Sequence, residues 1–163
     1  MVTGVAVAVS WLSACGQTYK PRTLTTPAAE VCALDGAAAR GSAWAPTCRV
    51  CHDIAPGRPA EPAGGPNLHD VYETLAGTVS LKYGYAYAAP IQAARRAGLI
   101  WTADNLDHYL KNPRAFLERF TGEHFPPTAN VMNFFVGGDG ADQERSRRDI
   151  IAYLQAIKNR PCS

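Results

Sequence analysis

Residues 102–112 carry the pattern of an amphipathic helix with marked ends. Their apolar side chains follow the i, i+3, i+4 spacing of one helical face and are Leu106, Tyr109 and Leu110. Thr102 is a favourable N-cap residue, and Pro113 lacks the backbone donor that a continuing helix needs. The segment therefore predicts a helix that begins after Thr102 and stops before Pro113.

A longer helical pattern covers residues 142–159. Its apolar residues recur at the same spacing and form one stripe, made of Ile150, Tyr153, Leu154 and Ile157. Lys158 and Arg160 stand at the C-terminal end, where positive charge interacts favourably with the helix dipole. We expect this helix to bury the stripe and expose the rest.

Three further segments give weaker helical signals: 68–75, 86–97 and an N-terminal stretch over 26–34. No segment alternates apolar and polar residues over the length of a strand. The chain holds 12 prolines and 14 glycines, which favours many turns between short elements. The sequence therefore predicts a small all-α fold.

Composition and charge exclude several classes of protein. Apolar residues make up 47% of the chain and charged residues 18%, so the chain can build a core and is not disordered. A net charge of +2 and an isoelectric point near 8.3 are too balanced for a nucleic-acid-binding protein. No run approaches about 18 apolar residues, which excludes a multi-span membrane protein.

Residues 1–14 carry no charge and are mostly apolar, as in the apolar region of an export signal. They lead into Leu12-Ser13-Ala14-Cys15, which resembles a bacterial lipobox, where the cysteine is lipidated and becomes the new N-terminus. A plain signal peptide or an uncleaved short anchor are the alternatives, and each takes the chain across the inner membrane. We expect an export signal at 1–14, a lipidated Cys15 with a flexible tether at 15–26, and a folded domain at 27–163. The domain would then lie on the periplasmic side of a bacterial membrane.

The string Cys48-Arg49-Val50-Cys51-His52 is the C-x-x-C-H pattern of covalent haem attachment. Two thiols at this spacing can add to the two vinyl groups of haem, and the next residue offers an imidazole to the iron. The alternatives are a redox disulfide or half of a zinc site. A zinc site needs a second Cys/His pair at a usual spacing, and the sequence has none. A redox disulfide does not need the trailing histidine.

An iron bound by His52 has a sixth coordination position. Met132 is the only methionine besides the initiator, and it lies in a stretch flanked by paired prolines and paired glycines. The other candidates are His69, His108 and His124. Each of these histidines is more typical of a surface or core position, and Met132 could instead fill a gap in the core.

With these residues placed, the chain resembles a class I cytochrome c over about residues 37–158. The segments that carry the resemblance are Trp44, Gly65-Pro66-Asn67-Leu68, 83–88, Trp101, 106–113, Met132 with Phe134, and 149–154. The resemblance implies short helices wrapped around one covalent haem c at 27–163. It also implies an electron-transfer protein rather than an enzyme.

The resemblance assigns a role to several residues around the cofactor. The carbonyl of Pro66 would accept a hydrogen bond from Nδ1 of His52 and so fix the tautomer of the ligand. Tyr85 would take the haem-propionate role, Trp101 would be the buried propionate-binding tryptophan, and Tyr109 would lie near the sulfur of Met132. His52 and Met132 would be the two iron ligands.

The chain also departs from the family. Pro46 should end the first helix near Ala45, where the family continues it. Arg40 occupies the place of a glycine at which the terminal helices pack, with Gly41 next to it. Thr74 replaces an arginine that many members direct at the propionates. Residues 114–129 form an insertion beside the ligand loop.

The resemblance accounts for all five cysteines. Cys15 would take lipid, and Cys48 and Cys51 would take haem. Cys32 and Cys162 belong to terminal segments, which pack together in this family. We therefore expect a Cys32–Cys162 disulfide, with two unrelated thiols as the alternative.

The expected partners are membrane redox complexes that donate and accept electrons, with no nucleic acid and no small-molecule substrate. The chain has few lysines with which to steer such encounters, namely Lys20, Lys82, Lys111 and Lys158, so a lipid tether could substitute proximity for charge. A fixed relay subunit of a membrane dehydrogenase, oxidase or photosynthetic complex is one alternative. A haem enzyme or gas-binding protein with an open sixth site is another.

Overall fold

The computed structural model of the chain describes residue 34 and residues 36–58, 64–129 and 136–159. The elements are α1 (Gly36–Ser42), α2 (Ala45–Cys48), the 3-10 helix η2 (Leu81–Tyr83), α3 (Ala89–Arg96), α4 (Ala103–Lys111), α5 (Pro113–Thr121) and α6 (Ala141–Asn159). In these residues the only strand-like pairing is an isolated bridge between Leu75 and Ile100. The predicted all-α fold is confirmed. Over the same residues, no helix combines the length and the apolar character needed to cross a membrane.

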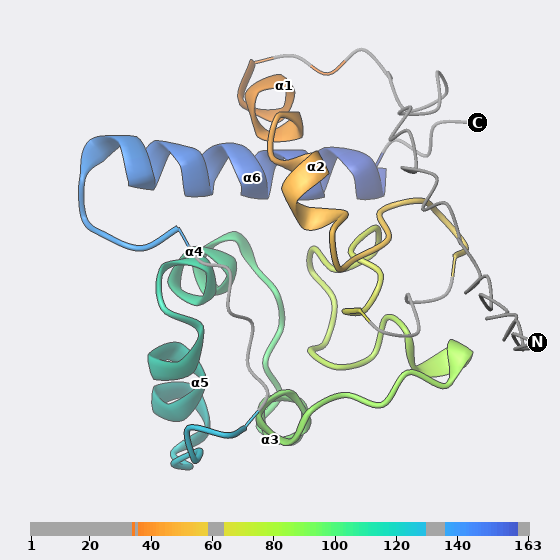
Figure 1. The fold of residues 1–163 in the computed structure, drawn as a ribbon, viewed down its shortest axis with the longest axis vertical. Helices are drawn as coiled ribbons and strands as arrows, with labels where there is room; N and C mark the ends of the chain where they lie inside the picture. The colour runs from red at the N-terminus through yellow and green to blue at the C-terminus, as the bar shows by residue number, and fades with distance from the viewer. Residues whose placement is uncertain (1–33, 35, 59–63, 130–135, 160–163) are drawn as a thin grey trace, which may run out of the picture.

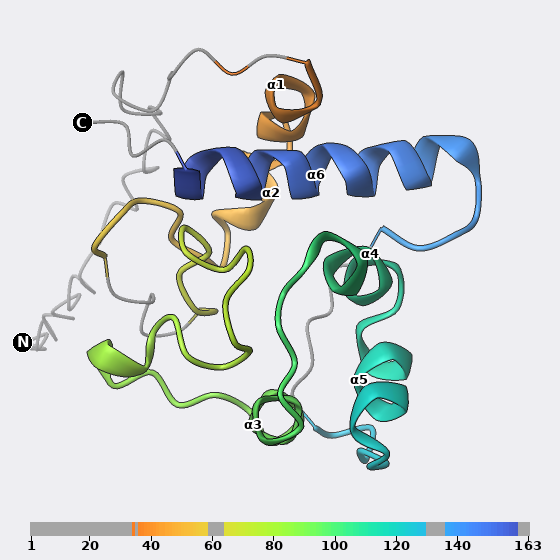
Figure 2. The same ribbon diagram turned by 180° about the vertical axis from the view of Figure 1, so that it is seen from behind.

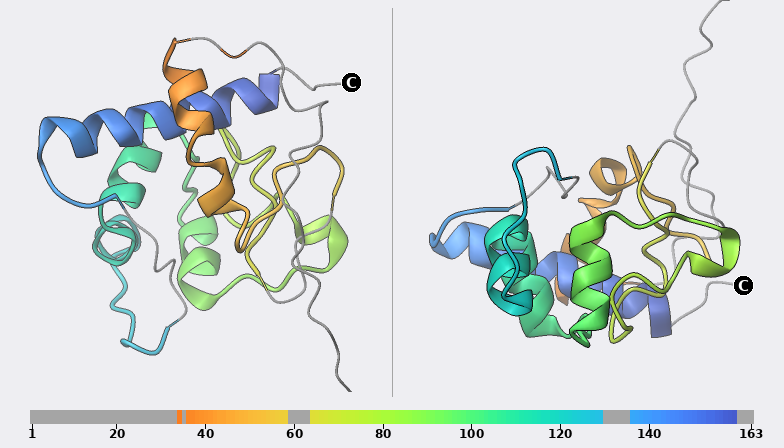
Figure 3. Two further views of the ribbon diagram at one scale, coloured as in Figure 1. Left: turned by 45° about the horizontal axis from the view of Figure 1, so that its top comes forward. Right: turned by 90° about the horizontal axis from the view of Figure 1, so that it is seen from below.

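Helix α6 runs along one side of the molecule, with α1 and α2 lying across it (Figures 1 and 2). Helices α3, α4 and α5 lie together on one part of the opposite side, and the loops of residues 49–88 occupy the other part (Figures 1 and 3). An apolar cluster joins these parts and includes Leu99, Trp101, Leu106, Phe116, Leu117, Ile150 and Leu154.

The contact between α1 and α6 depends on a glycine. A Cβ placed on Gly41 would lie 1.9 Å from the backbone oxygen of Asp149 and 2.8 Å from Cβ of Tyr153. Beside it, the guanidinium of Arg40 donates to both carboxylate oxygens of Asp149, at 2.8 and 2.7 Å. The close approach of the terminal helices is therefore present, with Gly41 rather than position 40 providing it.

The first helical region is divided in two. Helix α1 ends at Ser42, earlier than the predicted end near Ala45. The chain then forms α2, and Pro46 lies in its first turn. A backbone N–H at this place would have no carbonyl partner within the helix, so its absence costs no helical hydrogen bond. The prediction that Pro46 ends the first helix is therefore wrong: the proline lies at the start of α2, and α1 stops before it.

Helices α4 and α5 meet at a single shared residue. The Thr102 hydroxyl caps α4 by accepting from the Asn105 N–H at 3.3 Å, as predicted. The Asn112 N–H donates to the carbonyl of His108 at 3.1 Å, and its side chain accepts from the Ala115 N–H at 3.1 Å. Asn112 therefore ends α4 and caps α5, a helix that the sequence did not predict and that runs into residues 114–129, which we expected to be an insertion.

The helix predicted over residues 68–75 is wrong. These residues form successive four-residue turns, with Val71 N–H donating to the carbonyl of Leu68 and Thr74 N–H to that of Val71. Glu73 has a φ of 50°, a left-handed conformation that cannot continue an α-helix. The Glu73 N–H donates instead to the carbonyl of Trp101 at 2.9 Å. The apolar residues of this segment therefore belong to a loop and not to a helix.

The helices predicted over 86–97 and 142–159 are confirmed as α3 and α6. The one predicted over 26–34 lies outside the described residues, except for Leu34, which is not helical.

Candidate functional site

The C-x-x-C-H motif lies at the end of α2 and in the turn that follows. The carbonyl of Cys48 accepts hydrogen bonds from the N–H of Cys51 at 3.2 Å and of His52 at 2.9 Å. One backbone turn therefore presents both thiols and the imidazole. Cys48 is half-buried and Cys51 exposed, and the two thiols are not joined as a disulfide. Burial raises the pKa of the Cys48 thiol.

The His52 ring is held by the backbone of the facing loop. Its Nδ1 lies 2.6 Å from the carbonyl oxygen of Pro66, which is the contact that the resemblance implies. A carbonyl only accepts, so Nδ1 carries the proton and Nε2 keeps a free lone pair. Burial lowers the pKa of His52, and the bond to Pro66 opposes this shift. The arrangement favours a neutral ring with Nε2 available to a metal.

Gly65 makes room for this ring. A Cβ at Gly65 would lie 2.1 Å from Cε1 of His52, 2.4 Å from Nδ1 and 2.8 Å from Nε2, all shorter than real contacts. Its N–H also donates to the carbonyl of Cys51, which joins the loop to the motif. The sequence did not predict this role for Gly65, although its place directly before Pro66 could have indicated it.

A buried polar network holds the loop that carries Pro66. Asn67 is 4% exposed, and its amide donates to the carbonyls of Ala55 at 2.9 Å and Arg58 at 3.0 Å. Its backbone N–H donates to the hydroxyl of Ser80 at 2.9 Å, and the N–H of Ser80 donates to the hydroxyl of Tyr87 at 3.1 Å. Because these buried groups have partners, the loop is fixed on both sides.

Tyr85 lies close to the same loop. Its hydroxyl donates to the carbonyl of Gly64 at 3.2 Å, and its ring meets that of Tyr87 edge-on at 4.8 Å between centroids. Burial raises the pKa of Tyr85, with a smaller contribution from Tyr87. The Tyr85 hydroxyl therefore binds the residue that precedes Gly65, in the loop that faces the His52 ring.

Trp101 and Tyr109 form an aromatic pair, with ring centroids 4.8 Å apart. Trp101 is buried in the main apolar cluster, and its backbone N–H donates to the carbonyl of Thr74 at 3.0 Å. The Thr74 hydroxyl donates to the carbonyl of Asp70 at 2.6 Å and accepts from Lys158 at 3.2 Å. Position 74 is therefore tied to Trp101 and to α6.

Several predicted residues lie outside the described part of the chain, namely Cys15, Cys32, Met132 and Cys162. The other candidate histidines have separate surroundings. Buried His69 places Nδ1 2.9 Å from the carboxylate of Asp70, and exposed His124 lies 3.0 Å from that of Glu118. His108 stacks on Phe116 at 6.2 Å.

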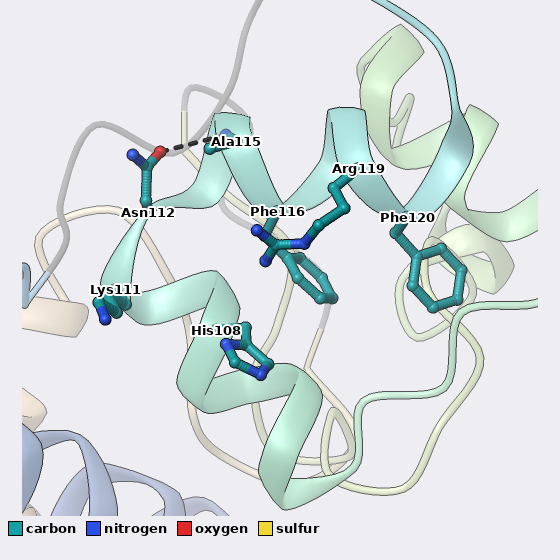
Figure 4. A pocket seen from close by; sticks show the side chains of 7 residues that line it. All are labelled: His108, Lys111, Asn112, Ala115, Phe116, Arg119 and Phe120. Atoms are coloured by element: carbon teal, nitrogen blue, oxygen red, sulfur yellow. Dashed lines mark hydrogen bonds between the residues drawn. The ribbon is translucent and has the colours of Figure 1, made fainter.

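An open hollow of about 700 Å³ lies between α4 and α5. Figure 4 shows His108, Lys111 and Arg119 around it, with Phe116 behind. The hollow contains none of the residues of the C-x-x-C-H turn, so it is a separate surface feature.

The residues that the structure describes fit a covalently attached haem. Both thiols come from one turn with the imidazole, Nδ1 of His52 is occupied by Pro66, and the absence of a side chain at Gly65 leaves space for the ring. The zinc alternative lacks support, because no group of three His, Cys, Asp or Glu side chains in these residues could hold a metal ion.

Known proteins agree with this geometry. No family model matches the chain. It is 36% identical to cytochrome c2 iso-1 of Rhodospirillum centenum over 77% of this chain and 99% of that protein. It is 33% identical to cytochrome c2 of Rhodospirillum rubrum over 76% of this chain and all of that protein.

Solved structures of cytochromes c2 have a fold similar to that of this chain. The structure of cytochrome c2 from Rhodospirillum centenum matches with a TM-score of 0.61 and 34% identity, over 75% of this chain and 98% of that one. That of cytochrome c2 from Rhodobacter sphaeroides matches with a TM-score of 0.59 and 27% identity, over 75% and 96%. This chain therefore belongs to the class I cytochromes c: it is an electron carrier, and its cofactor is one covalently attached haem c with its iron.

Proposed function

We propose that Cys48 and Cys51 attach the haem as thioethers and that Nε2 of His52 and the sulfur of Met132 are its axial ligands. The observation that carries this proposal is the 2.6 Å contact between Nδ1 of His52 and the Pro66 carbonyl. It fixes the ring in the one tautomer that can bind iron through Nε2 and makes the imidazole a stronger ligand. Met132 is assigned because the sequence offers no other thioether besides Met1.

When bound, the haem supplies one-electron chemistry between ferric and ferrous iron. The chain's own residues orient the ligand and limit access by water. Asn67 and Ser80 hold the loop of Pro66, and Trp101 with Tyr109 adds an apolar wall. A thioether ligand and a low-polarity pocket favour the reduced state. With His52 and Met132 both committed to iron, no coordination position is left for a substrate, so the protein transfers electrons and is not an enzyme.

We further infer that the chain shuttles electrons between membrane redox complexes on the periplasmic side. Residues 1–14 act as the export signal, Cys15 takes the lipid, 15–26 form the tether, and 27–163 are the cytochrome domain. The uncharged N-terminal run and its lipobox-like end support this assignment.

The terminal cysteines complete the proposal. Cys32 precedes α1 and Cys162 follows α6, and these two helices pack together through Gly41 and Asp149. A Cys32–Cys162 disulfide would close a long loop and stabilise the domain by about 3–5 kcal/mol in the chain-entropy treatment.

The ligation is tested by absorption spectra of the ferric protein, made with a haem-attachment system. Wild type should show a sulfur-to-iron charge-transfer band at the red end of the visible spectrum. Met132→Ala and Met132→His should both lose it, while His108→Gln and His124→Gln should keep it. A wild-type protein without the band, or a band that survives Met132→Ala, contradicts the assignment of Met132.

Intact mass spectrometry tests the two ends of the chain. A mature mass that lacks residues 1–14 and includes a lipid on Cys15 is expected. Mild reduction should raise the mass by two hydrogens if Cys32 and Cys162 are bridged, and should leave Cys32→Ala unchanged. A wild-type mass unaffected by reduction contradicts the bridge.

A further inference from the structure

The guanidinium of Arg114 binds the backbone of residues 125–129. Nη1 donates to the carbonyls of Phe125 and Pro126, both at 3.0 Å. Nη2 donates to the carbonyls of Pro127 at 3.3 Å and Ala129 at 3.2 Å. One side chain from the first turn of α5 thus gathers four backbone oxygens. A planar guanidinium suits this task, because its donors point outward in a fixed fork.

Few other hydrogen bonds hold this stretch. Pro126 and Pro127 have no N–H to donate. Among the described residues, the backbone donors with an assigned acceptor are Phe125, whose N–H donates to Glu118 at 3.1 Å, and Ala129, whose N–H donates to Pro126 at 2.8 Å. Among the described residues, Arg114 is therefore the side-chain donor to the carbonyls of this stretch, and the Pro126 carbonyl also accepts from the Ala129 N–H.

A second arginine binds the chain where the description resumes. Arg147 of α6 is only 3% exposed, and its Nη1 donates to the carbonyls of Val136 at 2.9 Å and Gly138 at 3.0 Å. Its Nε donates to the carboxylate of Asp107 at 2.7 Å, which compensates the buried charge. The N–H of Val136 also donates to the carbonyl of Leu110 at 2.8 Å.

These two arginines hold the two ends of one span of chain. Arg114 binds the backbone up to Ala129, and Arg147 binds it from Val136 onward; Met132 lies between them in the sequence. Fixing both ends reduces the number of conformations open to the span, so less entropy is lost when its sulfur binds iron.

We propose that Arg114 and Arg147 are positioning residues for Met132, and that they set how readily the thioether leaves the iron. The inference rests on the proposed His52/Met132 ligation. Arg114 is the more informative of the two, since it comes from the insertion and its contacts are all to backbone carbonyls. Neither arginine needs to touch the cofactor.

The test measures how tightly exogenous imidazole displaces the thioether in the ferric holoprotein, followed by loss of the sulfur-to-iron band. Apparent affinity for a competing ligand rises with the fraction of molecules in which the sixth position is open. Arg114→Met should bind imidazole at least about tenfold more tightly than wild type, because several charge-assisted hydrogen bonds are lost. The imidazole affinity of Arg114→Lys should lie between those of wild type and Arg114→Met, since an ammonium keeps the charge but reaches fewer carbonyls.

Two control variants separate positioning from general stability. Arg119→Met removes a guanidinium from the same helix that has no hydrogen-bond partner in the described part of the chain, and should match wild type (Figure 4). Thr102→Ala removes the N-cap of α4, a helix that does not carry Arg114, and destabilises that helix. It should lower the denaturant midpoint with little gain in imidazole affinity.

An imidazole affinity of Arg114→Met equal to wild type overturns the inference, and so does an equal gain in Thr102→Ala. If Arg114→Met does not fold, the imidazole affinities of Arg114→Lys and Arg119→Met are compared. Equal affinities of these two variants overturn the inference. A wild-type protein without the band overturns the ligation and this inference together. A band in wild type with unaffected Arg114 variants overturns this inference alone.

Discussion

Two glycines leave room for close contacts, but what they face differs. Gly41 faces the backbone of Asp149 in α6, and Gly65 faces the side-chain ring of His52. Backbone atoms inside a helix cannot move without disturbing the helix, whereas a ring can rotate if its hydrogen bond to Pro66 breaks. The first contact belongs to the fold as a whole and the second to the site, so changes at the two positions should have separable effects.

The largest effect is expected from Gly41→Ala. Its Cβ would lie 1.9 Å from the carbonyl oxygen of Asp149, so α1 and α6 must move apart, at a cost of about 3 kcal/mol of unfolding free energy. Guanidinium unfolding of the holoprotein measures the loss. The exposed neighbour Ala43, changed to Ser, should stay close to wild type. The thioether-to-iron band of the folded fraction should be retained, and a variant that keeps full stability would show that the helices are not in this close contact.

Gly65→Ala should have a smaller effect on stability and a larger one on the site. The added Cβ would overlap the His52 ring, which must rotate away from the Pro66 carbonyl, at a cost of about 1–2 kcal/mol. Absorption spectra should show a loss of the six-coordinate low-spin form. Pro66→Ala is the matched control, because the acceptor is a backbone carbonyl that this change keeps. Normal ligation in Gly65→Ala would remove the distinction between the two glycines.

The smallest effect concerns an exposed ion pair that involves neither glycine, Lys111 with Asp139. The hydrogen bond and positive charge of Lys111 lower the pKa of Asp139 below its ordinary value. A carboxylate with a lowered pKa stabilises the fold above its unfolded-state pKa, and this contribution disappears as the pH falls through the folded-state value. Lys111→Met should therefore lower Tm slightly at neutral pH, and the difference should vanish in acid. A difference that persists in acid would mean that Lys111 acts by packing rather than by charge.

The parts of the fold that follow local rules could be predicted from the sequence. Thr102 and Pro113 marked the ends of α4, and the apolar stripe of α6 gave its length to within one residue. The family resemblance also implied the His52–Pro66 contact, because the chain carries the family's Gly-Pro-Asn-Leu string, whose proline carbonyl accepts from the ligand histidine.

The remaining features depend on contacts that the sequence does not show. From the sequence, Pro113 predicts the end of a helix, but a proline also suits the first turn of a new helix once Asn112 caps it. The turn at 68–75 depends on the left-handed Glu73 and its bond to Trp101, which no local pattern indicates. The packing role of Gly41 and the four carbonyls bound by Arg114 appear only when distant segments come together.

The shared residue Asn112 has a consequence for motion. With no linker between α4 and α5, the corner has no slack to act as a hinge, and one helix cannot fray at this point without exposing the end of the other. The slowly exchanging amides of the two helices should therefore open as one cooperative unit. Helix α5 would then behave as an extension of the rigid frame of α4 rather than as a separately moving segment.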